Sequence, residues 1–271
     1  MKANPTGFQL TFLLFAMAFG AMLLTRQLAA ALQLPDAHFG TLGNLISYTF
    51  ELSLILVLPA TRRLVFDGLR KPLDRQMRWE AVSLSGLKLA ITFGLSGATT
   101  LWALHATDQS ADLVAQTFLS DRHEMDEHFF SAWGLVYAVL AISIGPLAEE
   151  VIYRGALFRM WEQQWGWIAG ALLSASVFSI IHPHNMIQTF LSAILYACLY
   201  RRTGTLWAPI LCHAFYNFLV SWLLFGHLLR IRPPDFATSL EPWIPHLICL
   251  PIGVVGFVLY IRLAARTPSR V

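Results

Sequence analysis

The sequence predicts an all-α, polytopic membrane protein in which about eight transmembrane helices enclose a polar cavity. Three observations lead to this prediction. Hydrophobic residues make up 56% of the 271 residues and charged residues only 13%, against about 25% charged residues in an ordinary soluble domain. Apolar runs of about 20 residues, the length that crosses a bilayer, recur along the chain. Basic residues gather in the short segments between these runs, as the positive-inside rule expects of cytoplasmic loops.

Charge and cysteine content limit the partners that the chain can have. The net charge of +3 is small, and basic residues placed between apolar runs indicate membrane topology rather than a nucleic-acid-binding surface. We therefore expect the lipid bilayer, and no nucleic acid, as a partner. Cys198, Cys212 and Cys249 all fall in apolar segments without metal-ligand spacing. They are expected to be small core residues outside any disulfide framework.

The eight predicted spans follow the apolar runs in order. The first run is long for a signal peptide, so we expect an uncleaved span. Pro146 follows Gly145 inside the fourth run and predicts a kink with a fresh helical segment. Pro183 follows the fifth run and cannot continue a regular helix, which predicts a short, tilted or broken helix there. The predicted spans are residues 8–24, 42–59, 81–104, 131–149, 168–182, 186–200, 206–228 and 244–261.

Basic segments set the predicted orientation. The segment 62–78 is the most basic of the chain, so we expect a cytoplasmic loop there and both termini on the same side. Arg154 and Arg159 return the chain to that side, and the segment 105–130, rich in Asp, Glu and His, suits the outer face. The short loops favour a multi-pass protein of a bacterial inner (plasma) membrane. The residues expected to form an interfacial aromatic belt are Trp161, Trp165 and Trp167.

Two adjacent carboxylates, Glu149 and Glu150, interrupt an otherwise apolar run, and Arg154 follows four residues after Glu150. Placing an ionised side chain in hydrocarbon costs between about 2.5 kcal/mol and about 10 kcal/mol or more, so such residues indicate a functional site. Residues four apart share a helix face, and Arg154 can therefore hold the Glu150 carboxylate ionised. Glu149 lies about 100° around the helix and faces other groups.

Later apolar segments supply the groups that Glu149 can face. They are His182, and His213 with Asn217, which are four residues apart and share a helix face. A carboxylate beside an imidazole can polarise water and pass its proton to a leaving amine, and His213 and Asn217 can both donate hydrogen bonds to an oxyanion. Glu149, His182 and His213 could instead hold a divalent metal such as zinc. The sequence leaves a metal cofactor and a metal-free mechanism both open.

Three motifs, ordered on successive apolar segments, carry a family resemblance. Together they resemble the CPBP family of intramembrane proteases, which contains the eukaryotic type II CAAX prenyl endopeptidases and bacterial Abi-type proteins. The resemblance covers residues 131–225, under half of the chain, and residues 1–130 carry no motif of this family. The motifs are Glu149-Glu150-x-x-x-Arg154, Phe178-x-x-x-His182 and His213-x-x-x-Asn217.

The resemblance implies an α-helical membrane protein of about eight spans, with a conical cavity open to the cytosol in which a peptide bond is hydrolysed. Both a metal-dependent and a glutamate-dependent mechanism are compatible with it. The roles that it implies are water activation by Glu149 with His182, oxyanion stabilisation by His213 with Asn217, and ordering of the site by Glu150 and Arg154.

Each motif also has a purely structural interpretation. Glu149, Glu150 and Arg154 could form an ion-pair cluster at a helix boundary. His182 could cap a broken helix in front of Pro183. His213 and Asn217 could form the kind of interhelical hydrogen bond found in membrane bundles.

Two further acidic features stand apart from the motifs. The segment His123–His128 resembles the helical zinc motif H-E-x-x-H, but its histidines are five residues apart and do not share a helix face. We expect a solvated loop there rather than a metal site. Glu51 is the one other acid inside a predicted span, where it could line the cavity or mark a separate polar contact.

We expect an intramembrane endopeptidase whose substrate is a membrane-associated protein or peptide. One alternative is a non-catalytic bacteriocin-immunity or interaction protein on the same scaffold. Another is a proton-coupled transporter, which is disfavoured because the first half of the chain has no polar centre to match the second. Residues 1–271 are expected to form a single membrane-embedded domain, with a catalytic core at 131–225 and additional spans in 1–130.

Overall fold

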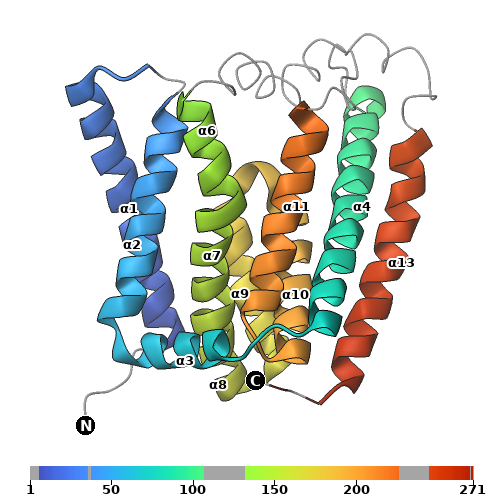
Figure 1. Cartoon of the computed structure of the whole chain (residues 1–271). Coiled ribbons are helices and arrows are strands. Elements are labelled where there is room, and N and C mark those ends of the chain that lie inside the picture. Colours follow the sequence, from blue (N-terminus) through green and yellow to red (C-terminus); the bar gives the residue numbers. More distant parts are fainter. Residues whose placement is uncertain (1–5, 36–37, 107–131, 226–243, 269, 271) are drawn as a thin grey trace.

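The computed structural model describes residues 6–35, 38–106, 132–225, 244–268 and 270. In these ranges all regular structure is helical and no strand occurs, which confirms the all-α prediction. Figure 1 shows most of the helices running side by side as a bundle. In chain order, the helices are α1 (Gly7–Leu32), α2 (Phe39–Val57), α3 (Pro59–Arg70), α4 (Arg75–Ala106), α6 (Ala132–Val139), η2 (Leu140–Ile144), α7 (Gly145–Glu150), η3 (Val151–Phe158), α8 (Arg159–Trp165), α9 (Trp167–Ile180), η4 (Pro183–Asn185), α10 (Met186–Thr203), α11 (Trp207–Phe225) and α13 (Ile244–Arg266).

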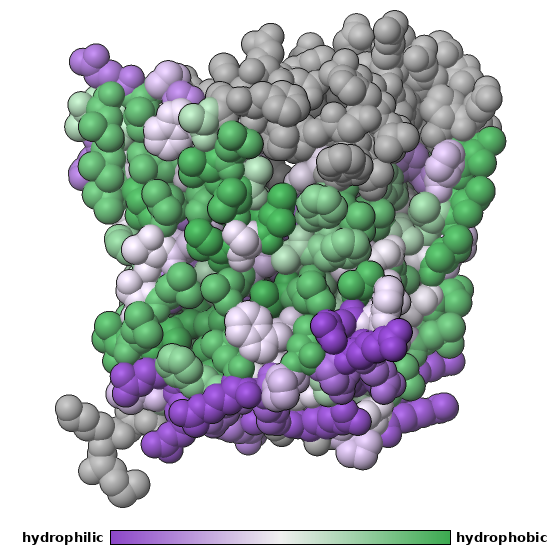
Figure 2. Space-filling model, viewed as in Figure 1, coloured by the Kyte–Doolittle hydropathy of each residue, from purple (hydrophilic) through white to green (hydrophobic). Residues whose placement is uncertain are grey.

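The outer surface of the bundle is apolar. Within the described ranges, 5 helices are long and apolar enough to cross a membrane, and Trp167–Ile180 is a shorter apolar helix. Large side chains point outward from α1 and α13, such as Phe12 at 74% and Ile252 at 57% exposure. Figure 2 shows apolar side chains across the middle of the visible face and a hydrophilic band at its lower end. Such a surface is covered by lipid, and the chain is an integral membrane protein.

The segment between α2 and α4 contains a helix, α3, where the sequence predicted only a basic loop. Pro59 lies in its first turn, where the missing N–H of proline needs no partner. Val65 and Gly68 are buried, whereas Arg62 and Arg63 are exposed. One face therefore packs on the bundle and the other carries positive charge. In Figure 1, α3 lies across the lower end of the bundle.

Glycines allow α4 and α13 to pack closely. A Cβ atom on Gly94 would lie 2.5 Å from the Cα of Leu250, and a Cβ atom on Gly253 would lie 3.0 Å from the Cα of Ile91. Both distances involve backbone atoms, which cannot turn aside as a flexible side chain does. Small residues are the usual means by which membrane helices approach one another.

The fourth predicted span is one continuous helical run, α6 to α8, from Ala132 to Trp165. Pro146 lies in the first turn of α7, as expected, but the chain does not break there. The turn before it is a π-helical turn, in which the Gly145 N–H donates to the Leu140 carbonyl five residues back instead of four. Turns of this π-type accommodate local distortion in a helix and recur at functional sites. A second π-helical segment, η3, follows directly after Glu150.

Two residues of this run are buried in the bundle. Arg154 is only 1% exposed. Trp161 is also buried, and its ring lies 5.9 Å from that of Phe8, in the first turns of α1, between centroids. The predicted aromatic belt is therefore wrong for Trp161, because α1 covers it. Trp165 is 45% exposed, as a belt residue would be.

The fifth predicted span is short, as expected. Helix α9 has 14 residues, a rise of about 21 Å at 1.5 Å per residue. It ends just before His182, and Pro183 then begins the short helix η4. The connection between α10 and α11 turns at Gly204, whose φ of +71° is a left-handed conformation that favours glycine. Helices α10 and α11 consequently lie as neighbours in the bundle.

The packing of α4 against α13 can be tested with two glycines of one helix. We expect Gly94→Ala to lower the free energy of unfolding by about 1–3 kcal/mol, because the added methyl meets the Leu250 backbone. The control is Gly86→Ala, since nothing lies within 4 Å of that position and alanine favours a helix by about 0.5–1 kcal/mol. Thermal unfolding in detergent measures both variants. Equal behaviour of the two would contradict the close contact.

Candidate active site

Glu149 and Glu150 lie on α7, the short segment between the two π-helical segments η2 and η3. The Glu150 side chain is fully buried, and Glu149 is 9% exposed. Adjacent residues point about 100° apart on a helix, so the two carboxylates meet different neighbours. Glu150 faces the interior of the bundle, and Glu149 faces a cavity.

Glu150 is held by two groups. Its Oε2 lies 3.2 Å from the Arg154 Nε, the ion pair expected from the four-residue spacing, and its Oε1 accepts a hydrogen bond from the His213 Nδ1 at 2.9 Å. A carboxylate can only accept, so Nδ1 carries the proton of this bond. Buried charges need such partners, because each one left unpaired costs several kcal/mol. The three residues come from α7, η3 and α11 and tie these segments together.

Aromatic rings enclose the Arg154 guanidinium. Its central carbon lies 4.7 Å from the ring centre of Phe178 and 5.1 Å from that of Tyr196. No guanidinium nitrogen makes a hydrogen bond to the described residues. Arg154 is therefore held by the charge of Glu150 and by cation–π contacts, which strengthen when water is excluded. Phe178, expected only to pack beside His182, also covers this cation.

Glu149 is surrounded by weaker polar contacts. The Tyr48 hydroxyl donates to its Oε1 at 3.5 Å, and the His213 Nε2 lies 3.7 Å from its Oε2. His213 thus stands between the two carboxylates, with Nδ1 on Glu150 and Nε2 toward Glu149. A carboxylate with long contacts keeps lone pairs available for water.

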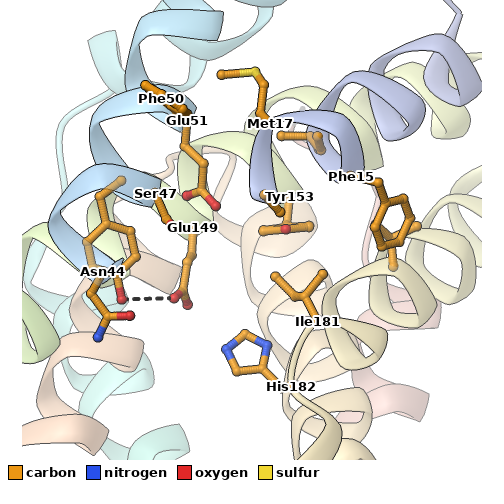
Figure 3. A pocket seen from close by; sticks show the side chains of 14 residues that line it. Phe15, Met17, Asn44, Ser47, Phe50, Glu51, Glu149, Tyr153, Ile181 and His182 are labelled. Atoms are coloured by element: carbon orange, nitrogen blue, oxygen red, sulfur yellow. Dashed lines mark hydrogen bonds between the residues drawn. The ribbon is translucent and has the colours of Figure 1, made fainter. Parts of the chain in front are cut away.

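His182 follows the last turn of α9 and has a defined proton position. Its Nδ1 lies 2.8 Å from the Phe178 carbonyl oxygen. A carbonyl only accepts, so Nδ1 carries the proton and Nε2 has the free lone pair. The capping contact considered for this residue is present, and it fixes the orientation of the ring. Figure 3 shows His182 and Glu149 facing the same space.

That space is a cavity of about 200 Å³. Glu149 and His182 are among its lining residues, whereas Glu150, Arg154 and His213 are not. Glu51 also lines it, one of the two possibilities left open for this acid. The lining residues are Leu14, Phe15, Met17, Ala18, Asn44, Ser47, Tyr48, Phe50, Glu51, Glu149, Tyr153, Val177, Ile181 and His182.

Asn217 is not among the residues that line the cavity. Its Nδ2 donates to the Ala141 carbonyl at 2.7 Å, a hydrogen bond between α11 and η2. In a π-type stretch, carbonyls lose their usual helical partners, and Asn217 satisfies one of them. This interhelical bond uses one of the two amide N–H groups, and its role toward an oxyanion stays a prediction.

The described residues contain no group of three or more His, Cys, Asp or Glu side chains arranged to hold a metal ion. The candidate ligands Glu149, His182 and His213 therefore do not fit a preformed zinc centre, in which three or four donors converge on one point. Cys198 and Cys212 are buried free thiols, as expected. The segment His123–His128 lies outside the described residues.

Two residues near the site were missed by the sequence reasoning. Lys88, on α4, is 7% exposed; its Nζ donates to the Tyr196 hydroxyl at 2.6 Å, and the Tyr196 ring stacks on His213 with 4.9 Å between centroids. A lysine alone in the middle of an apolar span was the signal that could have identified it. Tyr48 gave no comparable signal, because a tyrosine is unremarkable in a membrane helix.

Comparison with known proteins supports the resemblance carried by the motifs. Residues 131–219 match the family described as Type II CAAX prenyl endopeptidase Rce1-like. A Bacillus subtilis (strain 168) protein named "Putative membrane peptidase YdiL" is 29% identical over 85 residues, which are 30% of this chain and 34% of that protein. The chain thus matches about a third of the length of this relative. No solved structure matches.

The buried ion pair can be tested by a double-mutant cycle. We expect Arg154→Met to lower the free energy of unfolding by about 3–5 kcal/mol, because Glu150 keeps a buried charge without its cation. Adding Glu150→Gln should recover part of that loss. The exposed pair of Arg70 with Asp67 is the control, and Arg70→Met should cost at most about 1 kcal/mol. Denaturant titration in detergent measures all variants, and strictly additive effects would argue against the pairing.

Proposed function

We propose that this chain is an intramembrane endopeptidase that hydrolyses a peptide bond of a membrane-associated protein or peptide. The observation that carries the proposal is that Glu149 and His182, from separate motifs, line one cavity within a membrane bundle. The family match at residues 131–219 and the printed name of the bacterial relative both support a membrane peptidase.

In the proposed reaction, Glu149 and His182 activate water. The Glu149 carboxylate accepts a proton from a water molecule, and the free Nε2 of His182 accepts a hydrogen bond from the same water and aims it at the peptide carbonyl. Glu150 and Arg154 do not line the cavity and act by fixing His213. We propose a glutamate-dependent mechanism, because the acid and the imidazole are placed for this chemistry.

His213 and Asn217 are proposed to stabilise the oxyanion. The Nδ1 proton of His213 is bound to Glu150, so Nε2 donates only when the ring is the imidazolium cation. Glu150 and Glu149 both lie within 4 Å of its nitrogens. Asn217 has one N–H left after its bond to Ala141. Donors of this kind lower the barrier by about 2.7–4 kcal/mol each.

The proposed setting is a bacterial inner membrane with both termini in the cytoplasm. The first turn of α1 and the last turn of α13 lie at the same end of the bundle as α3 (Figure 1). That end carries the exposed arginines of α3, which the positive-inside rule assigns to the cytoplasm. The substrate then reaches the cavity from the bilayer or its cytoplasmic edge.

Loss of either water-activating group should abolish cleavage while the fold is retained. We expect Glu149→Gln and His182→Ala to reduce the cleavage rate by about 10²- to 10⁴-fold. The rate is measured on a library of membrane-tethered peptides with the purified protein in proteoliposomes. Asp67→Asn, at an exposed pair on α3, is the control and should cleave as the wild type does.

Two outcomes would contradict the proposal. Product patterns that are identical for the wild type, Glu149→Gln and His182→Ala would show that the cavity does no chemistry. Absence of cleavage by the wild type across the library, with a bound protein partner recovered instead, would favour the interaction protein. Thermal unfolding of each variant shows whether the fold is retained.

A further inference from the structure

Helix α2 brings a second acid into the cavity of Glu149. Figure 3 shows the Glu51 carboxylate entering the cavity between α2 and the helix that carries Glu149 and Tyr153. This acid lies outside the segment that matches the family, residues 131–219. The site is therefore built from both halves of the chain.

Close packing fixes α2 against the catalytic helix. A Cβ atom on Gly145 would lie 2.7 Å from the Tyr48 hydroxyl oxygen, so only glycine lets this ring reach the start of α7. Tyr48 then donates to the Glu149 carboxylate. Glu51 follows Tyr48 by three residues and shares its helix face. The position of Glu51 relative to Glu149 is thus set by packed backbone and not by a loose side chain.

Among the described residues that line the cavity with Glu51 there is no lysine or arginine. Among the residues lining the cavity, α7 and η3 contribute Glu149 and Tyr153, α2 contributes Tyr48, α9 contributes His182, and α1 contributes only apolar side chains. The charged side chain that acts on Glu51 is Glu149, which has the same sign. Glu150, by contrast, has both Arg154 and His213 within 4 Å.

Glu51 and Glu149 differ in the partners that can stabilise a negative charge on their carboxyl groups. The Oε2 of Glu51 is buried and has no hydrogen-bond partner in the described part of the chain, and a buried ionised group without partners is strongly disfavoured. Glu149 accepts a hydrogen bond from the Tyr48 hydroxyl. When two carboxyl groups share a site, one of them keeps a proton, and here this hydrogen bond favours the charge on Glu149.

We propose that Glu51 is a catalytic residue, the proton-carrying partner of Glu149, and that it acts as the general acid of the reaction. This inference rests on the proposed peptidase function. Glu149 on α7 removes the proton from water, and Glu51 on α2 donates a proton to the leaving amine.

The proton balance closes within the pair. Glu149 takes a proton from water as the hydroxide oxygen bonds to the peptide carbonyl carbon. Glu51 gives its proton to the peptide nitrogen as the C–N bond breaks, so the amine leaves neutral and Glu51 becomes a carboxylate. The proton on Glu149 then passes to Glu51 across the cavity and restores the starting state, with one water consumed.

Infrared difference spectroscopy tests the protonation state without any substrate. We expect the wild type in proteoliposomes at neutral pH to show the C=O stretch of a neutral carboxylic acid, and Glu51→Gln to lack it. Asp67→Asn removes an exposed carboxylate and should keep the band. Absence of the band in the wild type, or its loss in Glu149→Gln but not in Glu51→Gln, would overturn the assignment.

The cleavage rate as a function of pH tests the catalytic role. A general acid works only when protonated, so the wild-type rate should fall as pH rises through the titration of Glu51. We expect Glu51→Gln to cleave about 10²-fold more slowly and to lack this alkaline decline, and Glu51→Asp to recover part of both. Thermal unfolding should show Glu51→Gln to be folded, because the amide adds no charge.

The outcomes separate this inference from the proposed function. If Glu51→Gln cleaves at the wild-type rate with an unchanged pH profile, Glu51 is not the general acid, while the peptidase stands. If Glu51→Gln loses cleavage only of substrates that contain a lysine or arginine near the cleaved bond, the acid binds a substrate cation and our assignment is wrong. A wild type that cleaves nothing would overturn the proposed function, and the infrared band would still report on Glu51.

Discussion

The contact on which the site depends is the buried arrangement of Glu150 between Arg154 and His213. It places a carboxylate, a guanidinium and an imidazole in the centre of a membrane bundle, where none of them is stable alone. Together they satisfy one another: the ion pair spans 3.2 Å and the hydrogen bond 2.9 Å. Because His213 is fixed on one side by Glu150, its other nitrogen must face Glu149. The orientation of the cavity acid thus follows from a contact outside the cavity.

The sequence was informative at residues whose placement costs a large free energy when a partner is missing. Charged residues in apolar runs identified Glu149, Glu150 and Arg154, and the structure contains the Glu150–Arg154 pair. Pro183 predicted the short fifth helix, because proline lacks the N–H that a helix requires. The same argument applied to Pro146 predicted a kink with a fresh helical segment, and Pro146 lies in the first turn of α7 within one continuous helical run.

Other features depend on which helices become neighbours, and this does not follow from local pattern. Nothing in the sequence around Tyr48 indicates that it meets Glu149, because the two residues are 101 positions apart and the contact requires Gly145. Trp161 is typical of an interfacial residue until α1 covers it. Arg154 is a charged residue, yet it is buried in the core with its partner Glu150. Tertiary contacts override local preference in each case.

The length of α9 has a consequence for the membrane itself. Its 14 residues rise about 21 Å, while the hydrocarbon layer of a typical bilayer is about 30 Å thick. Ile168, Leu172 and Ile180 project from this helix to the outside, so lipid must meet it directly. Acyl chains adjust to such a hydrophobic mismatch by thinning locally. We therefore expect the bilayer to be thinner beside α9 than beside the longer helices of the bundle.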